Sequence, residues 1–343
     1  MRVGTTANRE GHQIFTNQLS RFAERADDSR ITALIDDVRG PLRVAVHGRD
    51  GVGRSTVSAA LAGAGITVAD DDSVDVDVVV VAEALKPEDR AMLGADASQS
   101  SRPRNPALVV LNKADLAGFA AGGPIAMADR RAADIAAVTG EPAVSMVALL
   151  AVATLDDELI SALRTLSVEP ADLTSTDGFL SAGHSLATAV RKRLLDTLDL
   201  FGIAHGVLAL RQGADAAELP AALHRLSQID RVVARLAAVG AEVRYRRVRS
   251  ALVALRAMAA GGMPALADFL SGDDAVVAVM AAAVDVVHAA GLTVDAGDEP
   301  SAHLARALHW HRYSRGPVNH IHRACGADIC RGSLRLLRRA EAG

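Results

Sequence analysis

Residues 44–56 constrain this chain more than any other segment. They read Val-Ala-Val-His-Gly-Arg-Asp-Gly-Val-Gly-Arg-Ser-Thr, which fits the phosphate-binding-loop pattern G-x-x-x-x-G-K-[ST] except that Arg54 replaces the lysine. A mostly apolar run over 43–47 precedes the loop, and a helix-like run over 55–64 follows it. A strand, a glycine turn and a helix in this order predict a parallel α/β sheet with an anion site at a strand end.

Each part of the loop has an expected role. Gly48 and Gly53 permit positive φ and a close approach of backbone N–H groups to phosphate. Arg54 keeps the positive charge, but a planar guanidinium is larger than an ammonium and prefers bidentate partners. We therefore expect phosphate binding to survive and transition-state geometry to suffer. The predicted phosphate contacts are Gly48, Arg49, Asp50, Gly51, Val52, Gly53, Arg54, Ser55 and Thr56, with the Ser55 hydroxyl as the ligand if Mg²⁺ binds.

A second motif selects the nucleotide. The apolar run 107–111 reads as a buried parallel strand and leads into Asn112-Lys113-Ala114-Asp115, the N-K-x-D pattern of guanine recognition. The Asp115 carboxylate can accept hydrogen bonds from guanine N1 and N2, the Lys113 stem can lie along the base, and Asn112 can tie this loop to the phosphate loop. A simple turn would also favour Asn and Asp, but the upstream loop favours guanine. The expected ligand is GTP or GDP.

A further guanine contact is expected in the loop that follows the apolar run 143–147. Ser145 takes this position in one register, and Ala148 takes it in another. The sequence leaves both registers open.

The interval between the two motifs lacks the usual switch segments of a GTPase. Residues 56–111 contain three aspartates at 70–72 and a second buried-strand pattern at 75–82, but no D-x-x-G. No Gln or His occupies the position expected for a water-orienting side chain. For the aspartates, a solvated turn is favoured over a metal contact. GTP hydrolysis is therefore expected to be weak or absent.

With these motifs, most of the chain resembles the actinobacterial dynamin-like GTPases, and among them the isoniazid-induced type. The resemblance implies a G domain joined to a helical neck or stalk, guanine nucleotide binding, and membrane remodelling by self-association. The chain departs from the family in Arg54, in the missing switch region and in its shorter length. Beyond the two motifs, the resemblance rests on residues 41–46, 84–89, 200–203, 247–255 and 307–312.

Two functions follow from the resemblance and the departures. The first is a guanine nucleotide-binding dynamin-like protein with weak or absent hydrolysis, acting in membrane remodelling or envelope stress. The alternative is a non-catalytic pseudo-GTPase that serves as the interaction partner of an intact dynamin-like GTPase. Self-association and contact with a membrane surface are expected under the first function.

The expected fold is an α/β G domain, with a shortened, doubly wound, mainly parallel sheet, plus an all-α helical bundle. A chain of 343 residues that is 50% hydrophobic can bury two ordinary cores. Residues 1–40 are predicted to form N-terminal helices that pack on the helical domain, because their apolar residues recur at helical spacing. The G domain is expected over 41–167 and the bundle over 168–343.

Charge and hydropathy bound the location and the partners. A net charge of −4 argues against nucleic acid as a partner. The N-terminal residues show no signal pattern, and Asp285 and His288 interrupt the long apolar stretch 275–292. We therefore expect a cytoplasmic protein, peripheral at the membrane where it contacts one.

Two clusters in the C-terminal half have competing interpretations. Arginines at 244, 246, 247 and 249 surround Tyr245 and form either a solvated basic face or a docking surface for anionic lipid. Cys325 and Cys330 follow His320 and His322, but this spacing fits no compact zinc site, so packed thiols are favoured.

Overall fold

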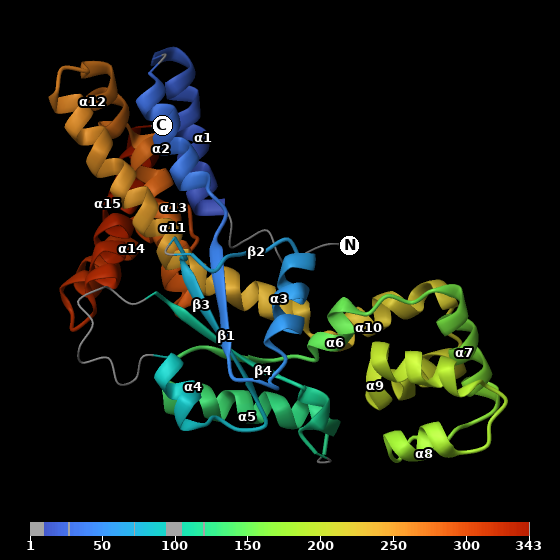
Figure 1. Ribbon diagram of the computed structural model, residues 1–343. Helices are drawn as coiled ribbons and strands as arrows, with labels where there is room; N and C mark the ends of the chain where they lie inside the picture. Colours follow the sequence, from blue (N-terminus) through green and yellow to red (C-terminus); the bar gives the residue numbers. More distant parts are fainter. Residues whose placement is uncertain (1–9, 27, 72, 94–104, 119–120, 343) are drawn as a thin grey trace. The chain divides into compact units, whose positions relative to one another are not determined.

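The computed structural model describes residues 10–26, 28–71, 73–93, 105–118 and 121–342. The chain divides into two compact units, whose elements are labelled in Figure 1. The sheet unit comprises Leu42–Arg235. The helical unit comprises Met1–Pro41 together with Leu236–Gly343.

The sheet unit is built on five parallel strands in the order β2-β1-β3-β4-β5. β1 is the first strand of this sheet in the sequence, and β2 lies on one side of it and β3 on the other. The strand order therefore reverses between β1 and β3, which is where open parallel sheets bind ligands at their carboxyl ends. The strands are β1 (Arg43–Gly48), β2 (Thr67–Val68), β3 (Val76–Ala82), β4 (Ala107–Asn112) and β5 (Ala143–Ser145).

Helices cover the sheet because its side chains alternate between two apolar faces. Val79 and Val81 of β3 belong to one buried cluster with Ala128 and Ala132, on the inner face of α5. The helix after the glycine loop, α3, contacts β1, β2 and α6 instead. The bounds of these helices are α3 (Arg54–Gly63), α4 (Pro87–Met92), α5 (Gly123–Thr139) and α6 (Ala148–Val152), with the short 3₁₀ helix η2 at Ala114–Leu116.

The sheet unit extends well beyond residue 167, where the sequence predicts a domain boundary. Leu194, Leu198 and Ile203 pack into the same core as Leu159 and Leu163, so the chain after 168 stays with the sheet. α9 belongs to the sheet unit because its apolar side chains find their partners on α6 and α7. The division between the units lies between residues 235 and 236. The added elements are α7 (Asp157–Val168), α8 (Thr176–Ser181), α9 (Thr188–Arg211), η3 (Ala216–Glu218) and α10 (Leu219–Ser227).

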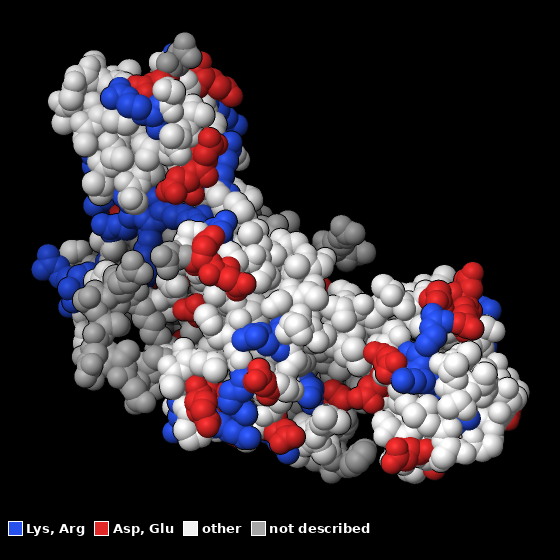
Figure 2. Space-filling view, in the orientation of Figure 1, with Lys and Arg blue, Asp and Glu red and all other residues white. Residues whose placement is uncertain are grey.

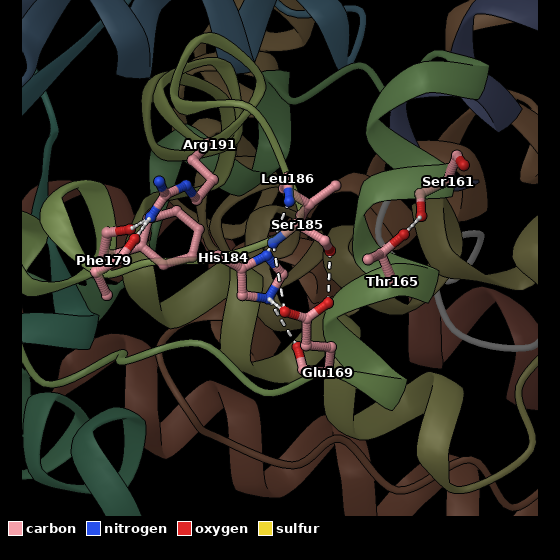
Figure 3. A network of polar contacts seen from close by, with 9 residues as sticks. Ser161, Thr165, Glu169, Phe179, His184, Ser185, Leu186 and Arg191 are labelled. Atoms are coloured by element: carbon pink, nitrogen blue, oxygen red, sulfur yellow. Dashed lines mark hydrogen bonds and ion pairs between the residues drawn. The ribbon is translucent and has the colours of Figure 1, made fainter.

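A polar network fixes the long connection between α7 and α9 (Figure 3). The Ser185 hydroxyl donates to Glu169 Oε2 at 2.5 Å, and His184 Nε2 lies 2.9 Å from the Glu169 carbonyl oxygen. The Leu186 amide donates to His184 Nδ1 at 3.0 Å, so both nitrogens of that ring serve the local fold. Arg191 donates to the Phe179 carbonyl from α9. The connection is therefore held by side chains as well as by its backbone.

The helical unit is an all-α bundle with one large core. Phe15 and Leu19 of α1 share that core with Tyr245 and Trp310. Gly11 packs directly against the backbone of Ala281, since an added Cβ would lie 2.4 Å from it. Its helices are α1 (Glu10–Ala26), α2 (Ser29–Arg39), α11 (Ile229–Ala260), α12 (Pro264–Ser271), α13 (Asp273–Ala289), α14 (Pro300–Arg315) and α15 (His320–Ala342), of which α11 begins in the sheet unit.

The four arginines around Tyr245 engage different partners within the chain. Figure 2 shows basic side chains gathered where Figure 1 labels α11 and α15, with acidic side chains nearby. Arg244 and Arg247 share one side of α11 and Arg246 and Arg249 another, because side chains three residues apart lie on the same helix face. The partners are the Ala237 carbonyl for Arg244, Glu242 for Arg246, the Gly40 carbonyl for Arg247 and Asp328 for Arg249.

The cysteines are packed thiols, as favoured from the sequence. Cys325 is buried in the helical core, and burial raises the pKa of its thiol to about 12. The Tyr313 hydroxyl and His322 Nδ1 form a hydrogen bond of 2.7 Å. Within the described residues, no helix combines the length and the apolar character needed to cross a membrane.

Candidate functional site

The loop between β1 and α3 adopts the conformation that its glycines allow. Gly51 and Gly53 have φ of +82° and +85°, a region that residues with a Cβ avoid. Gly48 is needed for a different reason, because an added Cβ would lie 2.9 Å from both the Val80 carbonyl oxygen and Val52 Cγ2. The loop is therefore packed tightly against β3 at the point where the strand order reverses.

The helix after the loop begins with its amides available to an anion. Gly53 is the N-cap of α3, and no side chain among the described residues caps this end. The first amides of a helix have no intrahelical acceptor, and the helix dipole adds partial positive charge there. The N-terminus of α3 thus suits a phosphate group.

Arg49 is held inside the structure by a buried carboxylate. Its Nε lies 2.8 Å from Asp89 Oδ1 and its Nη2 lies 3.3 Å from Asp89 Oδ2. The Asp89 side chain is fully buried and also accepts the Lys86 amide at the start of α4. This hydrogen bonding raises the pKa of Arg49. The ion pair ties the glycine loop to α4, and no motif in the sequence indicated this role for Asp89.

Asn112 joins three segments of the sheet unit. Its Nδ2 donates to the Val52 carbonyl oxygen at 2.9 Å, and its Oδ1 accepts the Ala148 amide at 3.0 Å. Nδ2 would lie 2.4 Å from a Cβ added at Gly53. The predicted tie between the N-K-x-D loop and the phosphate loop is confirmed, and it extends to the start of α6.

The structure also separates the two registers of the following loop. Ala148 is the residue beside Asn112, whereas Ser145 is buried in β5 with its hydroxyl 2.6 Å from Asp129 Oδ1 on α5. Asp129 is further paired with Arg231 at 2.9 Å. Ser145 is thus engaged in packing the sheet against α5 and is not brought to the Asn112 cluster.

The residues predicted to recognise the base lie just beyond Asn112. Lys113 is exposed with φ of +58°, and Asp115 is half-buried in η2. Burial raises the pKa of the Asp115 carboxyl, and the charge of Asp199 raises it further. Asp199 lies in α9 at a break in the helix, with φ 54° and ψ 176°. Nothing in the apolar pattern of α9 marks this break, so the sequence did not reveal the second carboxylate.

An open cleft of about 690 Å³ borders the phosphate loop. Within the described part of the chain, the Arg54 side chain forms no hydrogen bond or ion pair, so the guanidinium remains available to a ligand. Asp72 lies outside the described residues. Residues that line the cleft include His47, Arg54, Ser55, Asp70, Asp71 and Asp77.

The aspartates after β2 have two different environments. Asp71 accepts the Ser73 amide and hydroxyl and pairs with Arg43, which is the solvated turn favoured from the sequence. Asp70 lines the cleft together with Ser55. A hydroxyl and a carboxylate suit Mg²⁺, which takes few protein ligands and completes its shell with phosphates and water. No group of three or more His, Cys, Asp or Glu within the described ranges could hold a metal alone.

The predicted site residues therefore fall into three groups. Gly48, Gly51, Gly53 and Asn112 form one packed unit, to which Val52 contributes its carbonyl and Arg49 its tie to α4. Ser145 lies elsewhere. Asp50 is exposed in the loop, Arg54, Ser55 and Thr56 form the first turn of α3, and Lys113 and Asp115 follow Asn112.

No family model, curated protein or solved structure matches the chain.

Proposed function

We propose that this protein binds guanine nucleotides, GTP or GDP, as a dynamin-like G protein with weak or absent hydrolysis. The observation that supports it best is the pair of hydrogen bonds made by Asn112. They join the glycine loop and the N-K-x-D loop into one unit at the carboxyl edge of a parallel sheet. A polyphosphate and a base linked to it need such a pair of loops side by side.

In this proposal, the phosphates lie against the amides of the glycine loop and the first turn of α3. Arg54 supplies positive charge, and the absence of an internal partner for it in the described chain keeps that charge available. Ser55 and Asp70 would hold Mg²⁺, which neutralises phosphate charge when it is bound.

The base lies against Lys113 and Asp115. Guanine offers two N–H donors to one carboxylate, whereas adenine presents no such pair, so Asp115 provides the selectivity. Hydrogen bonds from these two donors favour the ionised form of Asp115, whereas the charge of Asp199 disfavours it. Binding of guanine would therefore offset the effect of Asp199.

Slow GTP hydrolysis is expected because the usual switch segment and the lysine of the loop are missing. Residues 56–111 contain no D-x-x-G, and a guanidinium stands where a compact ammonium would reach the β- and γ-phosphates. A role in membrane remodelling or envelope stress rests on the resemblance to the dynamin-like family.

Calorimetric titration tests the proposal. GDP and a non-hydrolysable GTP analogue should bind with and without Mg²⁺, and ADP and ATP should bind much more weakly. Asp115→Ala should abolish the difference between guanine and adenine nucleotides. The matched control is Asp134→Ala, which removes an exposed carboxylate of α5. Absence of heat with any guanine nucleotide at high micromolar concentration contradicts the proposal.

One observation favours the alternative of a non-catalytic interaction partner. The raised pKa of Asp115 means that its ionised form, which guanine requires, is disfavoured by its surroundings. In this alternative, the loops are a scaffold for docking an intact dynamin-like GTPase. Co-purification with such a partner that is unchanged by Asp115→Ala would support the alternative over the first proposal.

A further inference from the structure

His47 is the polar side chain at the end of an otherwise apolar strand. Val44, Ala45 and Val46 are buried, but 45% of the His47 side chain is exposed. It lines the same cleft as Arg54 and Ser55, directly before Gly48 in the chain. This imidazole therefore shares its cleft with the first turn of α3, against which the proposed function places the phosphates.

A carboxylate on the neighbouring strand orients this imidazole. His47 Nε2 lies 3.0 Å from Asp77 Oδ1, across the pairing of β1 with β3. A ring that donates from Nε2 to a carboxylate has Nδ1 as its acceptor. The Asp77 hydrogen bond raises the pKa of His47, so the neutral ring is a stronger base than an ordinary histidine.

Other charged groups face the same imidazole. Asp70, after β2, also raises the pKa of His47, whereas Arg54, at the start of α3, lowers it. Asp77 on β3 contributes the largest effect. The ring is therefore flanked by a carboxylate that orients it and by a cation on the phosphate side.

We propose that His47 is the general base of a residual GTPase activity and that Asp77 is its positioning residue. This inference rests on the proposed binding of GTP. The oxygen of a water attacks the γ-phosphorus, and the bond from the γ-phosphorus to the β–γ bridging oxygen breaks. GDP leaves with that electron pair. His47 Nδ1 accepts the proton of the water and later releases it to solvent, so the products are GDP and inorganic phosphate.

The test is phosphate release in a single turnover, with GTP affinity measured in parallel for every variant. His47→Ala should lower the rate at least about tenfold, since a general base typically contributes more than this, and should leave GTP affinity unchanged. Added imidazole should restore part of the rate to His47→Ala. The matched control is His311→Ala, which removes an exposed imidazole of α14 and should keep the wild-type rate.

Asp77→Asn separates orientation from a purely structural role. The rate should rise with pH as His47 loses its proton, and loss of the Asp77 charge lowers the pKa of His47. The rising part of the pH profile should therefore move to lower pH in Asp77→Asn, whereas a structural pair would leave its position unchanged.

The outcomes distinguish this inference from the proposed function. Failure of the wild-type protein to bind GTP overturns both. Binding without phosphate release overturns the general-base inference alone. The same holds if His47→Ala binds GTP and releases phosphate at the wild-type rate, or if imidazole restores nothing to a variant that has lost activity.

Discussion

The candidate site has two halves under the proposed function: a phosphate half, Gly48–Ser55, and a base half, Lys113 and Asp115. The two halves differ in how they are stabilised. Packing and hydrogen bonds hold the glycine loop, since Asn112 binds the Val52 carbonyl and Asp89 binds Arg49. In the base half, by contrast, Asp115 lies near a like charge from Asp199. The difference teaches that one half is preformed, whereas the other retains an electrostatic conflict, which the N–H donors of guanine would relieve under the proposed function.

The largest expected effect comes from Asn112→Ala, which removes the residue that joins the two halves. The Val52 carbonyl and the Ala148 amide would lose their partners in a buried region. The free energy of unfolding should fall by about 2–3 kcal/mol, and guanine nucleotide binding should be lost. Urea unfolding and calorimetry measure the two effects. An exposed control, Asn17→Ala, should change stability by less than about 0.5 kcal/mol.

Gly53→Ala tests whether the phosphate half is as tightly fitted as its geometry indicates. The new Cβ would meet Asn112 Nδ2 at 2.4 Å on a backbone with φ of +85°, which should cost about 1–3 kcal/mol of stability. The matched control is Gly63→Ala, where a Cβ meets nothing within 4 Å and φ is not positive. That control should be neutral or slightly stabilising. Equal effects of the two substitutions would contradict a preformed loop.

Asp199→Asn tests the conflict in the base half. Removing the Asp199 charge should lower the pKa of Asp115, because a like charge no longer opposes its ionisation. Guanine binding requires the ionised carboxylate and weakens as pH falls through this pKa. In Asp199→Asn, the weakening should therefore begin at lower pH than in the wild type. Calorimetry with GDP over a series of acidic pH values measures the shift, and identical profiles would show that Asp199 does not influence the site.

The smallest expected effect is that of Ser145→Ala. It removes one hydrogen bond to Asp129, which keeps its ion pair with Arg231, so stability should fall by about 1 kcal/mol. Nucleotide affinity should be unchanged, because Ala148 is the residue beside Asn112. A loss of GDP affinity as large as that of Asp115→Ala would indicate that Ser145 contacts the base.

Local sequence patterns predicted the strand, the glycine turn and the helix at residues 43–63 well. A glycine loop between an apolar strand and a helix specifies its own backbone, and an Asn at the end of a nearby parallel strand reaches that loop. The parallel sheet and the helical bundle also follow from periodicity, which reports the buried face of each element.

Other features depend on which elements meet, which periodicity does not report. The apolar residues of α9 are compatible with either core, and only packing assigns Leu194 and Leu198 to the sheet unit. The pairing of His47 with Asp77 depends on the register of β1 and β3. The register of β5 likewise decides between Ser145 and Ala148. Asp199 raises the pKa of Asp115 from a helix break that its own sequence does not mark.

Gly202 of α9 gives the site a dependence on a residue with no place in either motif. A Cβ there would lie 2.6 Å from Leu150 Cδ2 of α6, the same helix whose first amide binds Asn112. Any side chain at 202 would have to displace that leucine. Under the proposed function, nucleotide affinity would thus depend on packing at a position remote from the ligand.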